Sequence, residues 1–161
     1  YRGSAVGVGA FPFGDTTIAS DLRDIVLRAA VEGCVGETLA AVQAAEQLAV
    51  ATDPTVKRVL AIIADDEARH AELAWRTIAW AIERRPDIRA DVLTAIEDGA
   101  AMMTRDAGAA HAEPDAVMAA HGRLDARAIL AVRRRAVADV VLPCAQALLA
   151  RQTVARPAAR A

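Results

Sequence analysis

The chain has 161 residues and a formal net charge of −2, with 55% apolar residues but only 3% aromatic ones. This length suffices for one domain with a substantial core, and the alanine-rich composition predicts an all-α fold. The sequence lacks a basic patch interleaved with aromatics, an apolar stretch of membrane-spanning length and a signal-peptide pattern, which argues against nucleic-acid and membrane partners and for the cytoplasm.

The first predicted segments are an extended lead-in and a long helix. Residues 1–17 are rich in glycine and have no helical period, which is typical of extended chain. A helix is then expected from Ser20 or Asp21 to Ala51, because Asp21 and Asp24 suit a helix N-terminus.

A break follows at Thr52-Asp53-Pro54, where Asp53 can cap a second helix whose first residue is Pro54. This second helix is expected to end at residues 84–85, because Pro86 stops it. Such a short connection predicts that the first two helices are antiparallel neighbours.

The remaining chain predicts a helix over 87–105, a loop with one short helical piece over 106–124, a helix over 125–152 and a flexible tail over 153–161. Pro143 is expected to kink the last helix. Residues 18–152 should therefore form a single helical-bundle domain, and no strand pattern occurs.

A carboxylate and an imidazole interrupt the apolar stripe of the second helix. At helical spacing, the stripe contains Val56, Val59, Leu60, Ile63, Ala71, Ala74, Ile78, Ala81 and Ile82. Glu67 and His70 continue it through the middle, one turn apart. A buried charge costs on the order of several kcal/mol unless it is neutralised. A core-facing Glu-x-x-His pair therefore suggests a metal ion.

Glu37 occupies the centre of the matching face of the first helix. Residues within about 60° of it are apolar or small, apart from Arg23 near the helix start, whereas Glu32 lies about 140° away and ranks well behind. Glu37 is fifteen residues before Thr52, and Glu67 is fifteen after it. An antiparallel pair would bring these two carboxylates to the same height.

Two carboxylates and one imidazole are the ligands that a carboxylate-bridged metal centre takes from one helix pair. The alternative is a buried Glu67–arginine or Glu37–His70 pair that only rigidifies the core. A Glu-x-x-His pair alone recurs by chance in helices, but the level-matched Glu37 favours a metal.

Other titratable residues rank lower. His111 and His121 lie in the irregular region without spaced carboxylates and are expected to be exposed. Glu97 and Asp139 fall within otherwise apolar helices, where capping or solvated roles suit them as well as metal binding does.

Two stretches resemble a bacterial family of ferritin-like domain proteins. They are Glu32-Gly-Cys-Val-Gly-Glu-Thr38 and Ile63-Ala-Asp-Asp-Glu-Ala-Arg-His-Ala-Glu-Leu-Ala-Trp75. The resemblance covers roughly residues 7–85 well and the rest loosely, and the motifs are fairly specific in combination. It implies an all-α, ferritin-like antiparallel helical bundle.

The resemblance also implies that the chain, which starts at Tyr1, holds only the second half of such a bundle. In the family, an earlier segment carries a Glu-His-Ala-Ser helix and another Asp-Glu-x-x-His helix, and a Gly/Pro-containing connection leads to the Gly-Glu-Thr helix. A complete site needs a second Glu-x-x-His, which this sequence lacks. On the last helix, Asp139 is followed three places later by Leu142, which cannot be a ligand.

The resulting prediction is half of a di-iron carboxylate site with ferroxidase or dioxygen-activating oxidoreductase character. Glu37 is the expected terminal or bridging carboxylate, Glu67 the bridging carboxylate and His70 the terminal nitrogen ligand. Iron is the expected metal, with manganese or zinc as substitutes. No further catalytic residue is predicted.

Completion of the site is expected from a missing N-terminal half or from self-association, for example as a homodimer. Two other functions stay open. One is a metal-free helical bundle that acts as a structural or interaction module, which a buried arginine or lysine partner of Glu67 would favour. The other is a di-iron oxygenase of an organic substrate, which requires an apolar pocket beside the metals.

Overall fold

The computed structural model describes residues 21–106 and 115–150, which form an all-α fold without strands. Its elements are α1 (Leu22–Arg28), η1 (Ala29–Glu37), α2 (Thr38–Val50), α3 (Pro54–Arg84), η2 (Pro86–Ile88), α4 (Arg89–Met103), α5 (Ala116–Ala120), α6 (Ala126–Ala136), η3 (Val137–Val141) and α7 (Leu142–Ala150). The predicted lead-in 1–17 and tail 153–161 lie outside the described residues. Among the described helices, none is long and apolar enough to cross a membrane.

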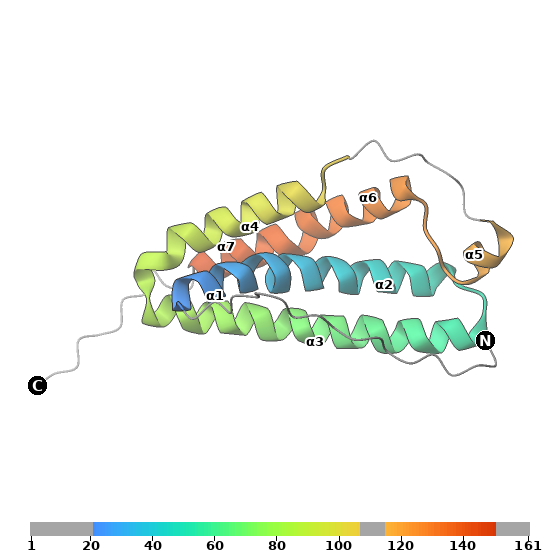
Figure 1. Cartoon of the computed structure of the whole chain (residues 1–161), viewed down its shortest axis with the longest axis horizontal. Helices are drawn as coiled ribbons and strands as arrows, with labels where there is room; N and C mark the ends of the chain where they lie inside the picture. Colours follow the sequence, from blue (N-terminus) through green and yellow to red (C-terminus); the bar gives the residue numbers. More distant parts are fainter. Residues whose placement is uncertain (1–20, 107–114, 151–161) are drawn as a thin grey trace, which may run out of the picture.

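Four long helical segments make up most of residues 21–106 and 115–150. α1, η1 and α2 follow one another without a break, as do α6, η3 and α7, and these two continuous segments are called the α1–α2 helix and the α6–α7 helix. Together with α3 and α4 they run back and forth along the long axis (Figure 1). The expected helix boundaries agree with these elements to within about two residues over the described ranges.

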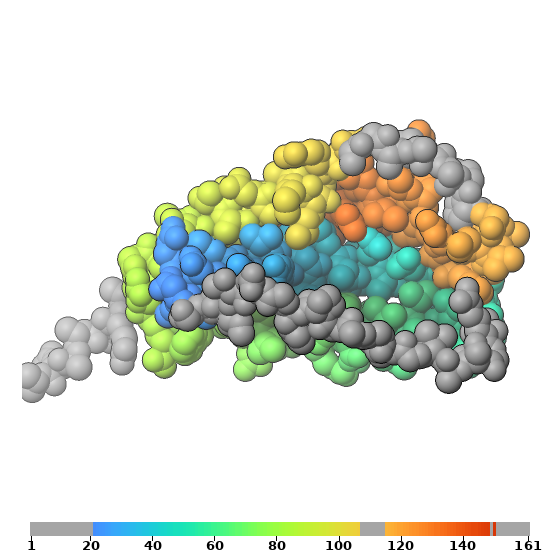
Figure 2. Space-filling model, viewed as in Figure 1, coloured from blue at the N-terminus to red at the C-terminus, as the bar shows by residue number. Residues whose placement is uncertain are grey.

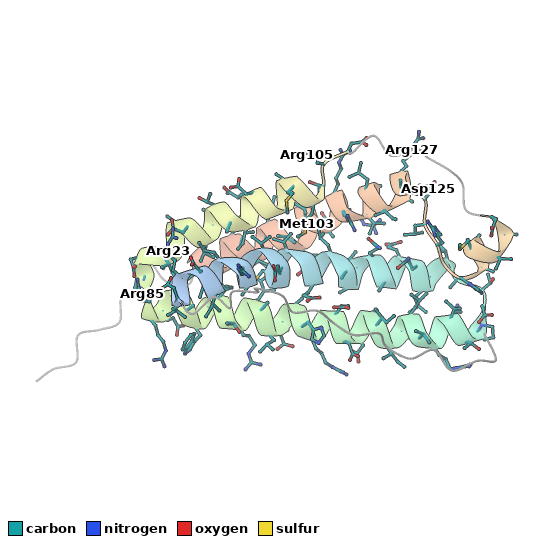
Figure 3. All side chains as sticks on the ribbon, viewed as in Figure 1. Arg23, Arg85, Met103, Arg105, Asp125 and Arg127 are labelled. Carbon is teal, nitrogen blue, oxygen red and sulfur yellow. The ribbon has the colours of Figure 1, made fainter. Side chains whose placement is uncertain are left out.

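Aspartates fix the helix starts. The carboxylates of Asp21, Asp53, Asp115 and Asp125 each accept hydrogen bonds from backbone N–H groups of the helix that follows, as N-caps do (Figure 3 labels Asp125). The predicted break is confirmed, because α2 ends at Val50 and α3 starts at Pro54. Hydrogen bonds from the N–H groups of Val56 and Thr55 hold the pKa of Asp53 below its ordinary value.

The core lies between the α1–α2 helix, the C-terminal part of α3, α4 and the α6–α7 helix. Its largest fully buried side chains are Ile78, Ile82, Ile88, Ile96, Val26, Val35, Val92, Val141 and Cys34. Burial raises the pKa of the Cys34 thiol to about 12, with a further contribution from Cys144. Figure 2 shows α4 and α6 along one long edge of the molecule and α3 along the other.

The apolar stripe of α3 is only half buried, which corrects the expectation that all of it faces the core. Ile78 and Ile82 are fully buried, but Val59 and Ile63 expose 50% and 41% of their surface. The difference follows from the path of the α6–α7 helix. At its α6 end it packs on α2, where the Arg133 Nε donates a hydrogen bond to Gln43 Oε1 at 3.3 Å, and it does not pack on the N-terminal half of α3.

Two helical stretches have the wider π geometry, η1 and η3. η3 ends two residues before Pro143. Proline removes an N–H and crowds the preceding turn, and a local π turn accommodates both effects. The helix therefore changes type just before Pro143, and the kink expected there stays a prediction. η1 ends at Glu37, so the first helix changes from π to α geometry at a predicted ligand.

The expected short helical piece is α5, which lies over the turn between α2 and α3. The backbone N–H groups of Thr52 and Asp53 donate to the carbonyl of Ala120 at 2.9 and 3.1 Å. The chain leaves α5 through Gly122, whose φ of 75° favours glycine. A Cβ there would lie 2.4 Å from the carbonyl oxygen of Gln47. α5 thus holds the helix pair together at its turn.

Candidate metal centre

Glu37, Glu67 and His70 converge where the α1–α2 helix meets α3. One ligand atom from each lies within 4.8 Å of those of the other two. His70 Nδ1 is 3.4 Å from Glu67 Oε2. Equal chain lengths on both sides of the turn bring Glu37 to the level of Glu67, as the sequence predicts. Among residues 21–106 and 115–150, this is the cluster of side chains suited to a metal ion.

The cluster faces outward and does not lie in the core, contrary to the expectation from the stripe. The side chain of Glu67 is 27% exposed and that of His70 is 62% exposed. An open groove of about 430 Å³ runs beside it, lined by Ala29, Gly33, Glu37, His70, Leu73, Ala74 and Thr77. Solutes can therefore reach the three ligand atoms directly.

Glu37 and Glu67 shift each other's pKa in opposite directions. A hydrogen bond to Glu67 raises the pKa of Glu37, and partial burial and the negative charge of Glu67 raise it further, while His70 opposes the shift. The same hydrogen bond lowers the pKa of Glu67, with help from His70. The site concentrates negative charge that a bound cation would neutralise.

No arginine or lysine of the described residues pairs with Glu37 or Glu67. The nearest arginine along the chain, Arg69, instead forms ion pairs with Asp65 and Asp66 on the exposed side of α3. Among the described residues, the ion-pair partner of Glu67 is therefore His70, at 3.4 Å, and not an arginine or lysine.

A close approach of the two helices positions the cluster. A Cβ added at Gly33 would lie only 2.5 Å from the Cβ of Ala74, so the small size of both residues permits the contact. Gly33 is one turn before Glu37, and Ala74 is one turn after His70. The role of Gly33 and Ala74 in this contact was not predicted, although a glycine inside a helix often marks a close contact.

A hydrogen-bonded chain behind the cluster connects the helices. Trp75 Nε1 donates to Thr38 Oγ1 at 3.3 Å, and the Thr38 hydroxyl donates to the carbonyl of Cys34 at 2.6 Å. Thr38 is buried and directly follows Glu37. These bonds fix α3 against the π-to-α transition and thereby orient Glu37. The sequence offers no local signal for this chain of bonds.

The lower-ranked candidates stay apart from the cluster. Glu32, Glu97 and Asp139 are exposed and do not join it. His121 is half-buried at the end of α5, which corrects the expectation of an exposed side chain, and His111 lies outside the described residues.

No family model matches the chain, and no curated protein or solved structure is significantly similar to it. The kind of metal that the site can bind must therefore be inferred from its ligand atoms. Carboxylate oxygens and an imidazole nitrogen bind divalent first-row metals such as Fe(II), Mn(II) and Zn(II).

Proposed function

We propose that this chain binds iron through Glu37, Glu67 and His70, as half of a carboxylate-bridged di-iron centre in a ferritin-like helical bundle. One observation carries the proposal: two carboxylates and an imidazole from facing helices place their ligand atoms within 4.8 Å of one another. The lack of a competing arginine or lysine among the described residues supports it, because a metal-free module would need another way to neutralise the carboxylates.

Two carboxylates and one imidazole suit iron as ligands, but they do not fill its coordination sphere. Three protein ligands can hold one cation, whereas a di-iron carboxylate centre draws on four helices, with a Glu-x-x-His motif from two of them. Another segment or chain must provide the second set. Glu67 is the bridging carboxylate, Glu37 a terminal or bridging carboxylate, and His70 the terminal nitrogen ligand.

Oxidation of Fe(II) by dioxygen is the activity that the arrangement supports best. When bound, iron at such a centre supplies redox chemistry between its ferrous and ferric states. The chain's own contribution is to hold the cation and to leave it accessible, because the exposed His70 and the open groove admit both ions and dioxygen.

A second activity, oxygenation of an organic substrate, is favoured by the groove itself. Its lining includes Ala29, Gly33, Leu73 and Ala74, so an apolar molecule could lie beside Glu37 and His70. This activity uses the same ligands and would appear as dioxygen consumption that depends on the added substrate.

Aerobic oxidation of Fe(II) tests the proposed function. The wild-type chain should accelerate the appearance of Fe(III) absorbance, and Glu67→Gln should slow it at least about tenfold, because a neutral amide is a far poorer ligand. Glu32→Gln is the matched control, since Glu32 is an exposed carboxylate on the same helix as Glu37. Equal rates for the wild type and Glu67→Gln would refute the ferroxidase assignment.

A further inference from the structure

The outward side of α3 next to the metal ligands carries large apolar side chains that the described helices do not cover. Its exposed large side chains are Val59 (50%), Ile62 (63%), Ile63 (41%) and Leu73 (65%). Ile25 of α1, also 44% exposed, precedes the groove residue Ala29 by one turn. These five residues, together with Glu67 and His70, are called the site face. The ion pair of Asp66 and Arg69 also lies on the exposed side of α3. Exposed large apolar residues grouped around a ligand cluster mark a binding surface.

The metal cluster lies near the middle of that helix. Thirteen residues of α3 precede Glu67, and fourteen follow His70. A twofold axis that passes between Glu67 and His70 would therefore superpose nearly the full length of α3 on an antiparallel copy of itself. It would also bring the incomplete ligand set opposite an identical set.

We propose that a second copy of this chain completes the metal site, with α3 packed antiparallel on α3 of the other copy and one divalent cation bound per chain. The inference rests on the proposed function, because metal binding drives the association. It names the partner that the proposed function leaves open.

The twofold axis also determines which residues of the two copies lie at the same level. Ile63 lies about 8 Å before the axis and Ala74 about 8 Å after it, at a rise of about 1.5 Å per residue. The twofold operation thus places Ile63 of one copy opposite Ala74 of the other. By the same count, Ile62 comes level with Trp75 of the other copy, and Val59 with Ile78. The pairing of Ile63 with Ala74 sets a large side chain against a small one, as interdigitation requires.

The charges of the ligands favour a second copy of the chain with bound cations as the partner, and disfavour an organic molecule. Two copies contribute four carboxylates and two imidazoles, and two divalent cations balance the four carboxylate charges. Without cations, the four carboxylates repel one another across the axis and weaken the apolar contact. The dimer is therefore linked to metal, and by mass action the metal and the second copy strengthen each other's binding.

Sedimentation velocity of the full chain at micromolar concentration, with EDTA or with Mn(II), tests this inference. Mn(II) should tighten dimerisation by roughly 100-fold and bind at one ion per chain. Glu67→Gln should stay monomeric with Mn(II). Val59→Lys should block dimerisation without touching a ligand, because it places a charge in the apolar contact.

Met102→Lys is the matched control, since Met102 is an equally exposed apolar residue, 56% accessible, on α4. It should dimerise like the wild type. A chain that binds Mn(II) but stays monomeric overturns the inference and leaves the proposed function intact. A chain that binds no Mn(II) overturns both. A dimer that persists in EDTA, or in folded Val59→Lys, shows that another surface associates.

Discussion

Alanine in place of Gly33 is expected to weaken Mn(II) binding by about 10- to 100-fold, the range seen when the support of a metal ligand is lost. The added Cβ would lie 2.5 Å from the Cβ of Ala74, and both atoms are fixed to helical backbone. The helices must move apart there, which carries Glu37 away from Glu67 and His70. The overpacking should also destabilise the fold by roughly 1–3 kcal/mol. Isothermal titration measures the affinity.

The chain offers two controls for this substitution. Ala74→Gly removes the methyl group that the new Cβ would meet, so the double variant Gly33→Ala/Ala74→Gly should recover most of the affinity. Gly36→Ala, in the same π-helical stretch, should bind like the wild type, because its Cβ would make only ordinary contacts, the nearest at 3.6 Å. Unchanged affinity in Gly33→Ala would show that the close approach does not position the ligands.

Divalent metal is expected to raise the melting temperature of the wild type by roughly 5–10 °C at about 100 times its dissociation constant, since mass action then contributes about 2.7 kcal/mol. Glu67→Ala should lose this gain, because it removes the central ligand. Without metal, the same variant should be at least as stable as the wild type, since it relieves the repulsion between the neighbouring carboxyl groups of Glu37 and Glu67. Differential scanning calorimetry with and without Mn(II) measures both effects.

Glu72→Ala is the control for that experiment. Glu72 is exposed, lies on the same helix and pairs with Arg76 on its surface, away from the cluster. Its loss should leave the metal-induced shift unchanged. If Glu67→Ala and Glu72→Ala were stabilised by metal to the same extent, the metal would have to bind elsewhere.

Local rules predicted the helices and brought the three ligands together. Asp53 and Pro54 mark the start of α3 because a carboxylate satisfies free N–H groups there and proline fits the first turn. Once the position of that turn is known, the equal number of residues from it to Glu37 and to Glu67 places both carboxylates at the same height along the helix pair. This holds whatever the rest of the fold is. The convergence of the cluster is thus the part of the site that sequence alone could predict.

The outward orientation of the cluster could not be predicted, because it depends on which helix covers which face. The stripe of α3 has the same period whether a neighbour covers it or not, and α6 packs on α2 instead. The π turns could not be predicted from the sequence either, since they depend on contacts such as the hydrogen bond from the Thr38 hydroxyl to the carbonyl of Cys34. Gly33 is an exception: a glycine one turn before Glu37 was a readable signal of close packing.

Metal content per chain, determined together with molecular mass after purification from iron-supplemented medium, tests the central claim most directly. The wild type should carry about one iron per chain in a dimer, as one cation per set of three ligands requires. Glu37→Gln and Glu67→Gln should each carry almost none, while Glu32→Gln should match the wild type. Iron absent from the wild type, or retained equally by Glu37→Gln and Glu67→Gln, would contradict a metal centre formed by Glu37, Glu67 and His70.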